Sequence, residues 1–230
     1  MKISIIIPVY HEEKTIIKVL KKINRHVKTN NEILVIYDKD NDPTFNVVKK
    51  YKTKKSNIKL IKNSTNSGIG VMNAIKTGIL KSKAEVLVIT MADLSDDITQ
   101  VDQMYALIKK GYDIICPSRY VKYGKKIGGP FIKTLLSRVA GLSLYYIFKV
   151  PTHDSTNAFK MYRRKIFKDI KIESTGGFEY SLEIVLKAYK KGYKITEIPT
   201  IWKDREEGKS RFKLIKWLPN YIKTYLQIIK

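Results

Sequence analysis

"ISIIIPVYHEEKTIIKVLKKINRHVKTNNEILVIYD", residues 3–38, places an amphipathic segment between two apolar runs. The runs Ile3–Tyr10 and Glu32–Asp38 have the composition of strands buried on both faces of a parallel sheet. Between them, Glu12–Val27 has apolar residues at helical spacing, with acids in the first turn and bases later, as the helix dipole favours. The stretch therefore predicts a strand, a helix and a second, parallel strand.

The same alternation continues along most of the chain. Further strands are expected over 57–63, 85–91, 112–120 and 193–199. Further helices are expected over 44–54, 71–83, 98–111 and 176–192. We therefore predict an α/β fold with a mainly parallel, Rossmann-like sheet flanked by helices.

Polar side chains stand where four of these strands are expected to end, namely Tyr10, Asp38, Asp93 and Arg119. In open parallel sheets, ligands bind beyond the carboxyl ends of the strands. The sequence therefore predicts a ligand site at this edge. The acids Asp96 and Asp97, a little further on, are expected at the start of the next helix.

Composition narrows the class of protein. The net charge of +24 is carried mostly by scattered lysines, and it would suit either an anionic ligand or an AT-rich genome. No nucleic-acid-recognition motif accompanies it, so nucleic acid is not an expected partner. A single cysteine, Cys116, fits a reducing compartment, and we expect it in the core. Neither a signal peptide nor an apolar stretch of about 18 residues is visible.

Two weaker patterns have ordinary interpretations. The turn "SGIG", residues 67–70, resembles a phosphate-binding loop but lacks the third glycine, so a tight structural turn is favoured. The histidines His11, His26 and His153 show no metal-ligand spacing.

An ordered series of motifs gives the chain a resemblance to a known family. These motifs are "SIIIPVYHEE", "EILVIYDKDNDPT", "NSGIGVMNAIKTG", "VITMADL", "SRY", "PTHDSTNAFKMYRRKIF", "GFEYSLEIVLKA" and "DREEGKSRF". In this order they resemble family 2 glycosyltransferases of the GT-A fold, with the polyprenyl (dolichyl) phosphate mannose and glucose synthases as the most similar members. The match spans essentially the whole chain.

The resemblance implies three groups of site residues. Positions that match donor-binding residues of the family are Pro8, Tyr10, Glu12, Ile36, Asp38, Ala92 and Asp93. Positions that match ligands of a lipid-phosphate acceptor are Arg119, Lys133 and Ser137. The implied catalytic set is Asp93, Arg119, Arg205 and Arg211, where the last two match a basic pair on a loop that closes over the donor.

The implied cofactor is a divalent cation, Mg²⁺ or Mn²⁺, at the Asp-x-Asp motif of the family. Met91 replaces the first acid of that motif, and a thioether is a poor ligand for either ion. One carboxylate can suffice when phosphates supply further oxygens. We therefore predict a weakened metal site with Asp93 as its principal protein ligand, and a larger share of charge stabilisation for the arginines. Ser95, also in this motif, stands where a glutamine often assists.

The chain departs from the family pattern at further positions, which are His11 for asparagine, Tyr37 for an acid, Lys133 for arginine, and Asn157-Ala158 for Ser-Gly. At position 133 a lysine provides a point charge instead of a two-pronged grip on phosphate. These replacements bear on the identity of the donor and on the strength of the metal site.

The resemblance implies transfer of a hexose, with inversion, from a GDP- or UDP-sugar to a polyprenyl phosphate. Such an acceptor is already ionised, so no general base is needed. A glycan hydroxyl acceptor, as in surface polysaccharide synthesis, would need a base, for which Asp154 or Glu179 are candidates. A catalytically degenerate protein that only binds nucleotide sugar is a third alternative.

The resemblance also implies contact with a membrane. The segments 131–148 and 212–229 mix aromatic and aliphatic residues with Lys and Arg, which suits either a headgroup layer or packing against the domain or a partner. We expect a catalytic domain over 1–211 and an amphipathic C-terminal helix over 212–230. The expected location is the cytoplasmic face of the membrane, through the lipid surface or a membrane protein partner.

Overall fold

A computed structural model describes residues 2–52, 57–64, 68–174, 177–205, 207 and 214–226. The helices are α1 (Ile16–His26), α2 (Pro43–Lys52), α3 (Val71–Lys81), η1 (Ile98–Gln100), α4 (Val101–Lys109), α5 (Phe131–Tyr146), α6 (Ile166–Asp169), α7 (Tyr180–Lys190) and α8 (Leu214–Leu226). The strands are β1 (Ile3–Val9), β2 (Asn31–Tyr37), β3 (Ile58–Lys62), β4 (Val86–Ile89), β5 (Ile114–Ser118), β6 (Lys125–Ile127), β7 (Lys160–Arg163), β8 (Ile195–Pro199) and β9 (Ile201–Lys203).

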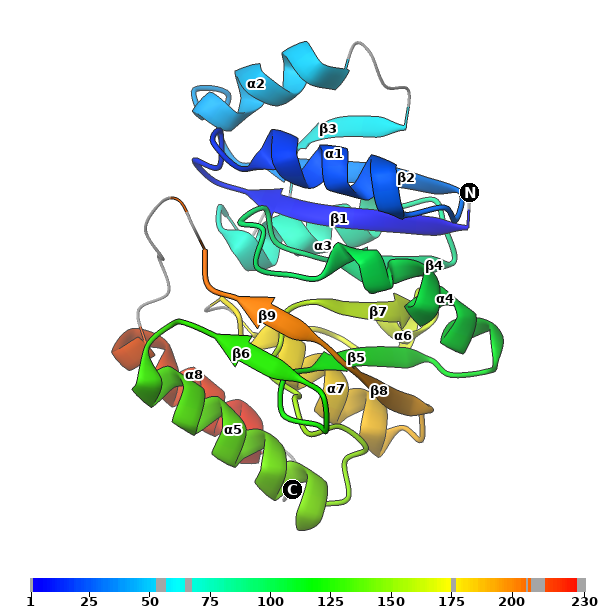
Figure 1. Cartoon of the computed structure of the whole chain (residues 1–230), viewed down its shortest axis with the longest axis vertical. Coiled ribbons are helices and arrows are strands. Elements are labelled where there is room, and N and C mark those ends of the chain that lie inside the picture. Colours follow the sequence, from blue (N-terminus) through cyan, green and yellow to red (C-terminus); the bar gives the residue numbers. More distant parts are fainter. Residues whose placement is uncertain are drawn as a thin grey trace.

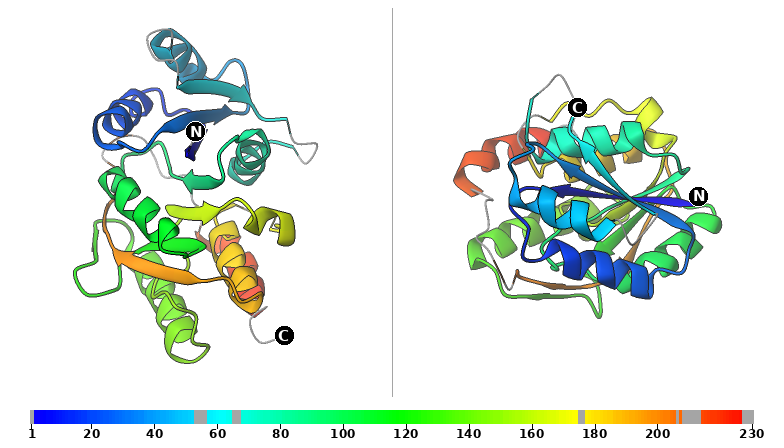
Figure 2. Two further views of the ribbon diagram at one scale, coloured as in Figure 1. Left: turned by 90° about the vertical axis from the view of Figure 1, so that its right-hand side faces the viewer. Right: turned by 90° about the horizontal axis from the view of Figure 1, so that it is seen from above.

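The main sheet has the strand order β3-β2-β1-β4-β7-β5-β8 and helices on both faces (Figures 1 and 2). All neighbours pair in parallel except β7, which runs antiparallel between β4 and β5. The prediction of a mainly parallel sheet is confirmed, because every strand expected from the apolar runs is present. From β1 the chain adds β2 and β3 on one side and β4 on the other, so the strand order reverses between β1 and β4. In open parallel sheets a ligand crevice is expected at such a point.

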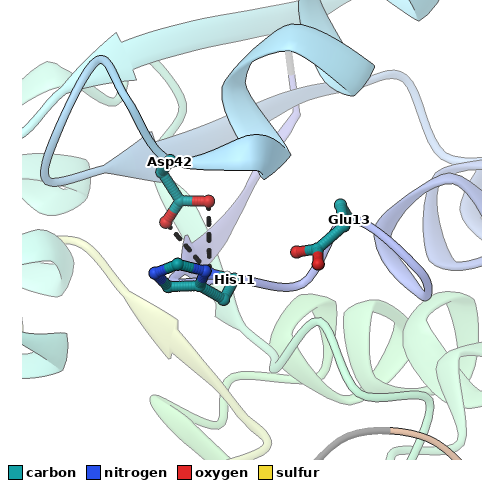
Figure 3. A group of neighbouring side chains, drawn as sticks. All are labelled: His11, Glu13 and Asp42. Carbon is teal, nitrogen blue, oxygen red and sulfur yellow. Dashed lines mark hydrogen bonds between the residues drawn. The ribbon is translucent and has the colours of Figure 1, made fainter.

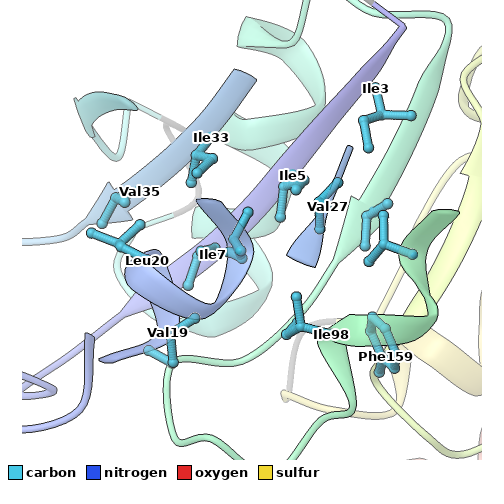
Figure 4. Packing of buried hydrophobic residues seen from close by; sticks show 14 of the residues in the cluster. Ile3, Ile5, Ile7, Val19, Leu20, Val27, Ile33, Val35, Ile98 and Phe159 are labelled. Atoms are coloured by element: carbon cyan, nitrogen blue, oxygen red, sulfur yellow. The ribbon is translucent and has the colours of Figure 1, made fainter. Parts of the chain in front are cut away.

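Alternating side chains divide the core into two layers. Ile3, Ile5 and Ile7 of β1 belong to the layer formed with α1, α2 and α4, part of which Figure 4 shows. Ile6 belongs to the other layer, formed with α3 and α7. Strands β2 and β4 divide in the same way, because successive side chains of a strand point to opposite faces. Cys116 lies in the second layer, fully buried, as expected.

The sequence misplaced the start of one helix and did not indicate three short strands. Helix α1 begins at Ile16, so the two acids expected in its first turn, Glu12 and Glu13, lie in the loop before it. That loop is held by contacts to the β2–α2 turn, described below. Strands β6, β7 and β9 were not predicted, because each has only three or four residues and carries Lys or Arg.

Helix α8 lies beside α5 (Figure 1) and also contacts α7. The Tyr225 hydroxyl donates to Ser143 Oγ of α5 (2.8 Å), and its ring meets Phe148 edge-on. The described part of the C-terminal helix therefore packs against the rest of the molecule. A division of the chain at residues 211 and 212 stays a prediction.

Candidate active site

The carboxyl ends of β1, β2, β4 and β5 lie at one edge of the sheet. Tyr10, Asp38, Asp93 and Arg119 follow these strands, so the structure brings together the side chains that were expected to share an edge. Asp93 and Arg119 lie on either side of the position where β7 is inserted, which separates the edge into two halves. After the roles that the resemblance implies, we name these halves the donor side, with β1, β2 and β4, and the acceptor side, with β5, β6, β9 and α5.

On the donor side, Asp38 anchors the glycine turn that precedes α3. Its Oδ2 accepts from the backbone N–H of Gly70 (2.9 Å), and its Oδ1 accepts from Asn63 Nδ2 (2.8 Å). Gly68 and Gly70 have φ angles of 94° and 118°, which residues other than glycine rarely adopt. These contacts give the turn a structural role, in line with the interpretation favoured from the sequence.

The loop after β1 is tied to the turn after β2. Asp42 accepts the backbone N–H of His11 (2.9 Å) and that of Thr44 (2.8 Å), and the Thr44 hydroxyl accepts the N–H of Glu12 (2.8 Å). This is why Glu12 and Glu13 stand outside α1. It also holds Glu12 at the sheet edge, where the site residues gather.

These contacts also bring three possible metal ligands within 4.8 Å of one another, namely His11, Glu13 and Asp42 (Figure 3). No spacing in the sequence indicates this group, because Asp42 lies far along the chain from the other two. Both carboxylate oxygens of Asp42 already accept backbone N–H groups, and His11 is exposed. The contacts therefore assign Asp42 to closing the loop, and proximity alone does not make a metal site.

Three predicted donor residues, Pro8, Ile36 and Ala92, are buried. Pro8 and Ile36 are paired across β1 and β2, and Ile36 and Ala92 belong to the hydrophobic layers. They shape the floor of the donor side instead of offering polar groups. Tyr10 is exposed, so its ring is accessible to a ligand.

Asp93 lies at the centre of a charged cluster. Its Oδ1 accepts from the backbone N–H (3.1 Å) and the hydroxyl (2.6 Å) of Ser95, and its Oδ2 accepts from Arg205 Nη2 (2.9 Å). Arg205 Nη1 also lies 3.5 Å from Glu12 Oε1. Glu12, Asp93 and Arg205, which are far apart in the sequence, therefore meet at one place. Arg211 of the expected basic pair lies outside the described residues.

A second carboxylate lies beneath Asp93. Asp96 is buried and accepts from the Thr90 hydroxyl (2.8 Å) and the Met91 N–H (3.1 Å). Burial, and then the negative charge of Asp93, raise the pKa of Asp96 to about 6. The expectation that Asp96 begins the next helix was wrong, because Thr90 and Met91 bind it inside the loop. Asp97 does take that place and caps η1 at Thr99.

Met91, which stands where the motif of the family has its first acid, is partly buried. Its side chain packs against the core layer formed with α3 and α7. It therefore contributes apolar contact instead of a ligand atom.

On the acceptor side, Arg119 forms a two-pronged ion pair with Asp154. Arg119 Nε donates to Asp154 Oδ2 (2.6 Å) and Nη2 donates to Oδ1 (2.8 Å), with side chains only 8% and 0% exposed. Burial alone would raise the pKa of Asp154, but the guanidinium more than offsets it and holds that pKa below its usual value. The charge of Arg119 is therefore largely neutralised within the protein.

The first turns of α5 bring Lys133 and Ser137 to the same place. Tyr120, next to Arg119, forms a hydrogen bond between its hydroxyl and Ser137 Oγ. The guanidinium of Arg119 lies 5.1 Å from the centre of the Tyr120 ring. Burial, and then the positive charges of Arg119 and Lys126, lower the pKa of Lys133 to about 8. The three predicted acceptor residues Arg119, Lys133 and Ser137 thus belong to one cationic cluster.

The candidate general bases are badly placed to take a proton from a sugar hydroxyl. Asp154 has no exposed side-chain surface and is committed to Arg119. Glu179 is also buried, beside α8, where Asn220 approaches its carboxylate. Neither carboxylate is open to a substrate in this structure.

The mainly parallel sheet with helices on both faces is the architecture of the GT-A glycosyltransferase fold. The solved structure of glucosyl-3-phosphoglycerate synthase from Mycobacterium tuberculosis with Mn²⁺, UDP and glucosyl-3-phosphoglycerate has this architecture. It superposes with a TM-score of 0.73 at 14% identity, covering 99% of this chain and 79% of that one. The chain also matches the glycosyl transferase family 2 model over residues 4–171, and it belongs to that family.

Two curated relatives carry related names. A dolichol-phosphate mannosyltransferase of Pyrococcus furiosus is 28% identical over 218 residues, and the match covers 93% of this chain and 60% of the relative. A polyprenol monophosphomannose synthase of Mycolicibacterium smegmatis is 24% identical, with 93% and 85% covered. The chain thus spans about 60% of the length of the Pyrococcus protein.

Proposed function

We propose that this chain transfers a hexose from a GDP- or UDP-sugar to the phosphate of a polyprenyl acceptor, with inversion at the anomeric carbon. The observation that carries the proposal is the division of one sheet edge into two halves. The donor side offers Glu12, Asp93 and Arg205, and the acceptor side offers the cation Lys133 next to the ion pair of Arg119 with Asp154. The names of the two curated relatives support the same substrates.

The reaction needs little proton transfer from the protein. A phosphate oxygen of the acceptor forms the new bond to the anomeric carbon, while the bond from that carbon to the diphosphate breaks. The nucleotide diphosphate leaves with the electron pair. Because a phosphomonoester is ionised near pH 7, positioning and charge stabilisation can supply the catalysis. The burial of Asp154 and Glu179 favours this acceptor over a glycan hydroxyl.

The donor side fits a divalent cation that is held chiefly by the substrate's diphosphate. Asp93 is the carboxylate that would bind it, since its side chain is 13% exposed at the sheet edge. When bound, Mg²⁺ or Mn²⁺ would neutralise charge on the leaving diphosphate. Arg205 already contacts Asp93, so it is placed to share that neutralisation with its guanidinium. Ser95 fixes the orientation of the carboxylate.

The acceptor assignment can be tested by partition. Radiolabelled GDP- and UDP-hexoses are incubated with polyprenyl phosphate and Mn²⁺, and label is followed into the organic phase. Label in the organic phase is expected with one of the donors. Label that stays in the aqueous phase would overturn the lipid acceptor. Calorimetric binding of a nucleotide sugar without transfer would instead indicate the degenerate protein.

The Michaelis constant for the acceptor is expected to rise as the pH increases from 7 to 9. The lowered pKa of Lys133, about 8, means that its ammonium group loses its proton over this range. The protonated form, present below pH 8, attracts the acceptor phosphate, and the neutral form above pH 8 does not. The phosphate itself, with a second pKa of about 6, stays a dianion throughout. Initial rates at several acceptor concentrations measure the effect.

Lys133→Arg is the matched variant for this prediction. A guanidinium remains protonated at pH 9, so the rise of the Michaelis constant should largely disappear. An unchanged pH profile in Lys133→Arg would show that another group titrates.

We also propose that α5 lies against the membrane that carries the acceptor. Apolar side chains along the helix are exposed, among them Phe131 (77%) and Val139 (56%), and α5 contains Lys133 and Arg138 but no acid. Ile127 and Ile201 of the strand pair β6–β9 are also exposed. Such a composition suits a headgroup layer, most simply at the cytoplasmic face. Among the described helices, none is long and apolar enough to cross a bilayer.

Replacing Phe131 and Val139 together with serine is expected to weaken binding to anionic vesicles at least about tenfold, because each loses apolar burial in the lipid. Co-sedimentation measures the binding. Leu80→Ser is the matched control, since Leu80 of α3 is equally exposed (72%) but lies away from α5. Equal vesicle binding by both variants would contradict the assignment of α5.

A further inference from the structure

Lys126 stands out on the acceptor side because, among the described residues, its ammonium group has no carboxylate within ion-pair distance, and Asp204 and Asp154 act on it only from further away. It lies in the middle of β6 between two exposed residues, with its own side chain half-buried. Its ammonium group donates to the Thr134 hydroxyl of α5 and lies 5.3 Å from the centre of the Trp202 ring. Among the residues that the structure describes, Lys126 makes no ion pair within 4.0 Å.

The strand pair β6–β9 explains this placement. Lys126 is paired with Trp202 in the parallel register of these two strands. The Arg119 guanidinium lies 5.9 Å from the centre of the same ring, so one indole holds two cations near each other. Gly129 allows the lysine to approach, because a Cβ at that position would lie 3.2 Å from Lys126 Nζ.

The cations of this cluster differ in how far the protein neutralises them. Arg119 is paired with Asp154 through two hydrogen bonds. Lys126 is held by a hydroxyl and an aromatic face, both of them neutral. Burial, and then the charge of Arg119, lower the pKa of Lys126, and the more distant Asp204 and Asp154 only partly offset them, so the protonated form is held at a cost. A cation held at a substrate-facing edge by neutral groups is one that an anionic ligand would stabilise.

We infer that Lys126 is a direct ligand of a phosphomonoester on the acceptor, which it grips together with Lys133. The two lysines supply the two positive charges that balance a phosphate dianion. Arg119, neutralised by Asp154, orients Tyr120 and Trp202 around them. This inference rests on the proposed function and adds a residue that the motifs did not indicate, since β6 was not expected and Lys126 is one of many lysines.

Steady-state kinetics with Lys126→Ala and Lys125→Ala test the role. Lys125 precedes Lys126 in the same strand but is exposed, so it is a matched loss of one charge. In Lys126→Ala the Michaelis constant for the acceptor should rise about tenfold or more, with the constant for the nucleotide sugar unchanged. Lys126→Arg keeps the positive charge and should therefore restore most of the affinity for the acceptor. A lysine with only a structural role would not be expected to show such a rescue of acceptor affinity. An unchanged acceptor constant, or an equal loss in Lys125→Ala, would overturn the inference.

Binding without turnover separates this inference from the proposed function. Geranyl phosphate and inorganic phosphate are titrated into the wild type and both alanine variants by calorimetry, without donor. Binding by the wild type and Lys125→Ala that is at least tenfold weaker in Lys126→Ala supports the role even if no sugar transfer occurs. Equal binding by all three proteins, or none by the wild type, overturns it. Tighter binding of geranyl phosphate indicates a lipid-borne phosphate, and equal binding of the two ligands indicates a small soluble one.

Discussion

Asp93→Asn is expected to lower the turnover number about 10²- to 10³-fold, the range seen when one electrostatic group is removed from an active site. The substitution keeps the shape of the side chain but removes the charge that binds Arg205 at 2.9 Å. On the proposed function, it also removes the carboxylate that would hold a divalent cation beside the diphosphate. Initial rates at saturating donor and acceptor measure the change.

Asp97→Asn is the matched control for Asp93→Asn. Asp97 caps η1 through Thr99, and asparagine caps a helix about as well as aspartate. Its turnover number should therefore stay within about twofold of the wild type. Nearly full activity in Asp93→Asn would remove this residue from the site. A similar loss in both variants would point to a general effect of charge on the loop.

Asp154→Asn is expected to lower the free energy of unfolding by about 3–5 kcal/mol, the usual effect of breaking a buried ion pair by removing one partner. Arg119 would keep its charge in a place where its side chain is only 8% exposed, and its two strong hydrogen bonds would lose their ionised acceptor. Urea denaturation followed by circular dichroism measures the change.

The exposed pair of Lys62 and Asp40 supplies the comparison. Asp40→Asn also removes one partner of an ion pair, but both side chains are more than half exposed, so little change in stability is expected. Equal stability of Asp154→Asn and the wild type would show that Arg119 finds another partner.

Much of the architecture follows from the sequence, because buried parallel strands are continuous apolar runs. The runs around Ile5, Leu34 and Val88 fill both faces of the sheet and cannot stay in water. Strands β6, β7 and β9 lacked this signal. Fully buried Lys160 of β7 shows why, because its ammonium group donates to Ser155 O and Ser181 Oγ, and these polar partners leave no apolar pattern in the sequence of the strand.

The candidate site was predicted in part. The strand ends located Asp93 and Arg119, and the resemblance added Lys133 and Arg205. The sequence did not show how the charges are matched. Asp96 was expected at a helix start, yet it lies buried beneath Asp93. Lys126 belongs to none of the motifs and was not indicated by the sequence.

Hydrophobic periodicity was enough to predict the alternation of strands and helices, and the polar residues after the expected strands were enough to predict where a site lies, because both patterns are local. Which charges are neutralised became visible in the folded protein alone. Arg119 is paired with Asp154, whereas Lys126 faces a hydroxyl and an indole. The physical reason is that the electrostatic state of a side chain depends on burial and on neighbours brought from distant segments, and neither is encoded by spacing along the chain.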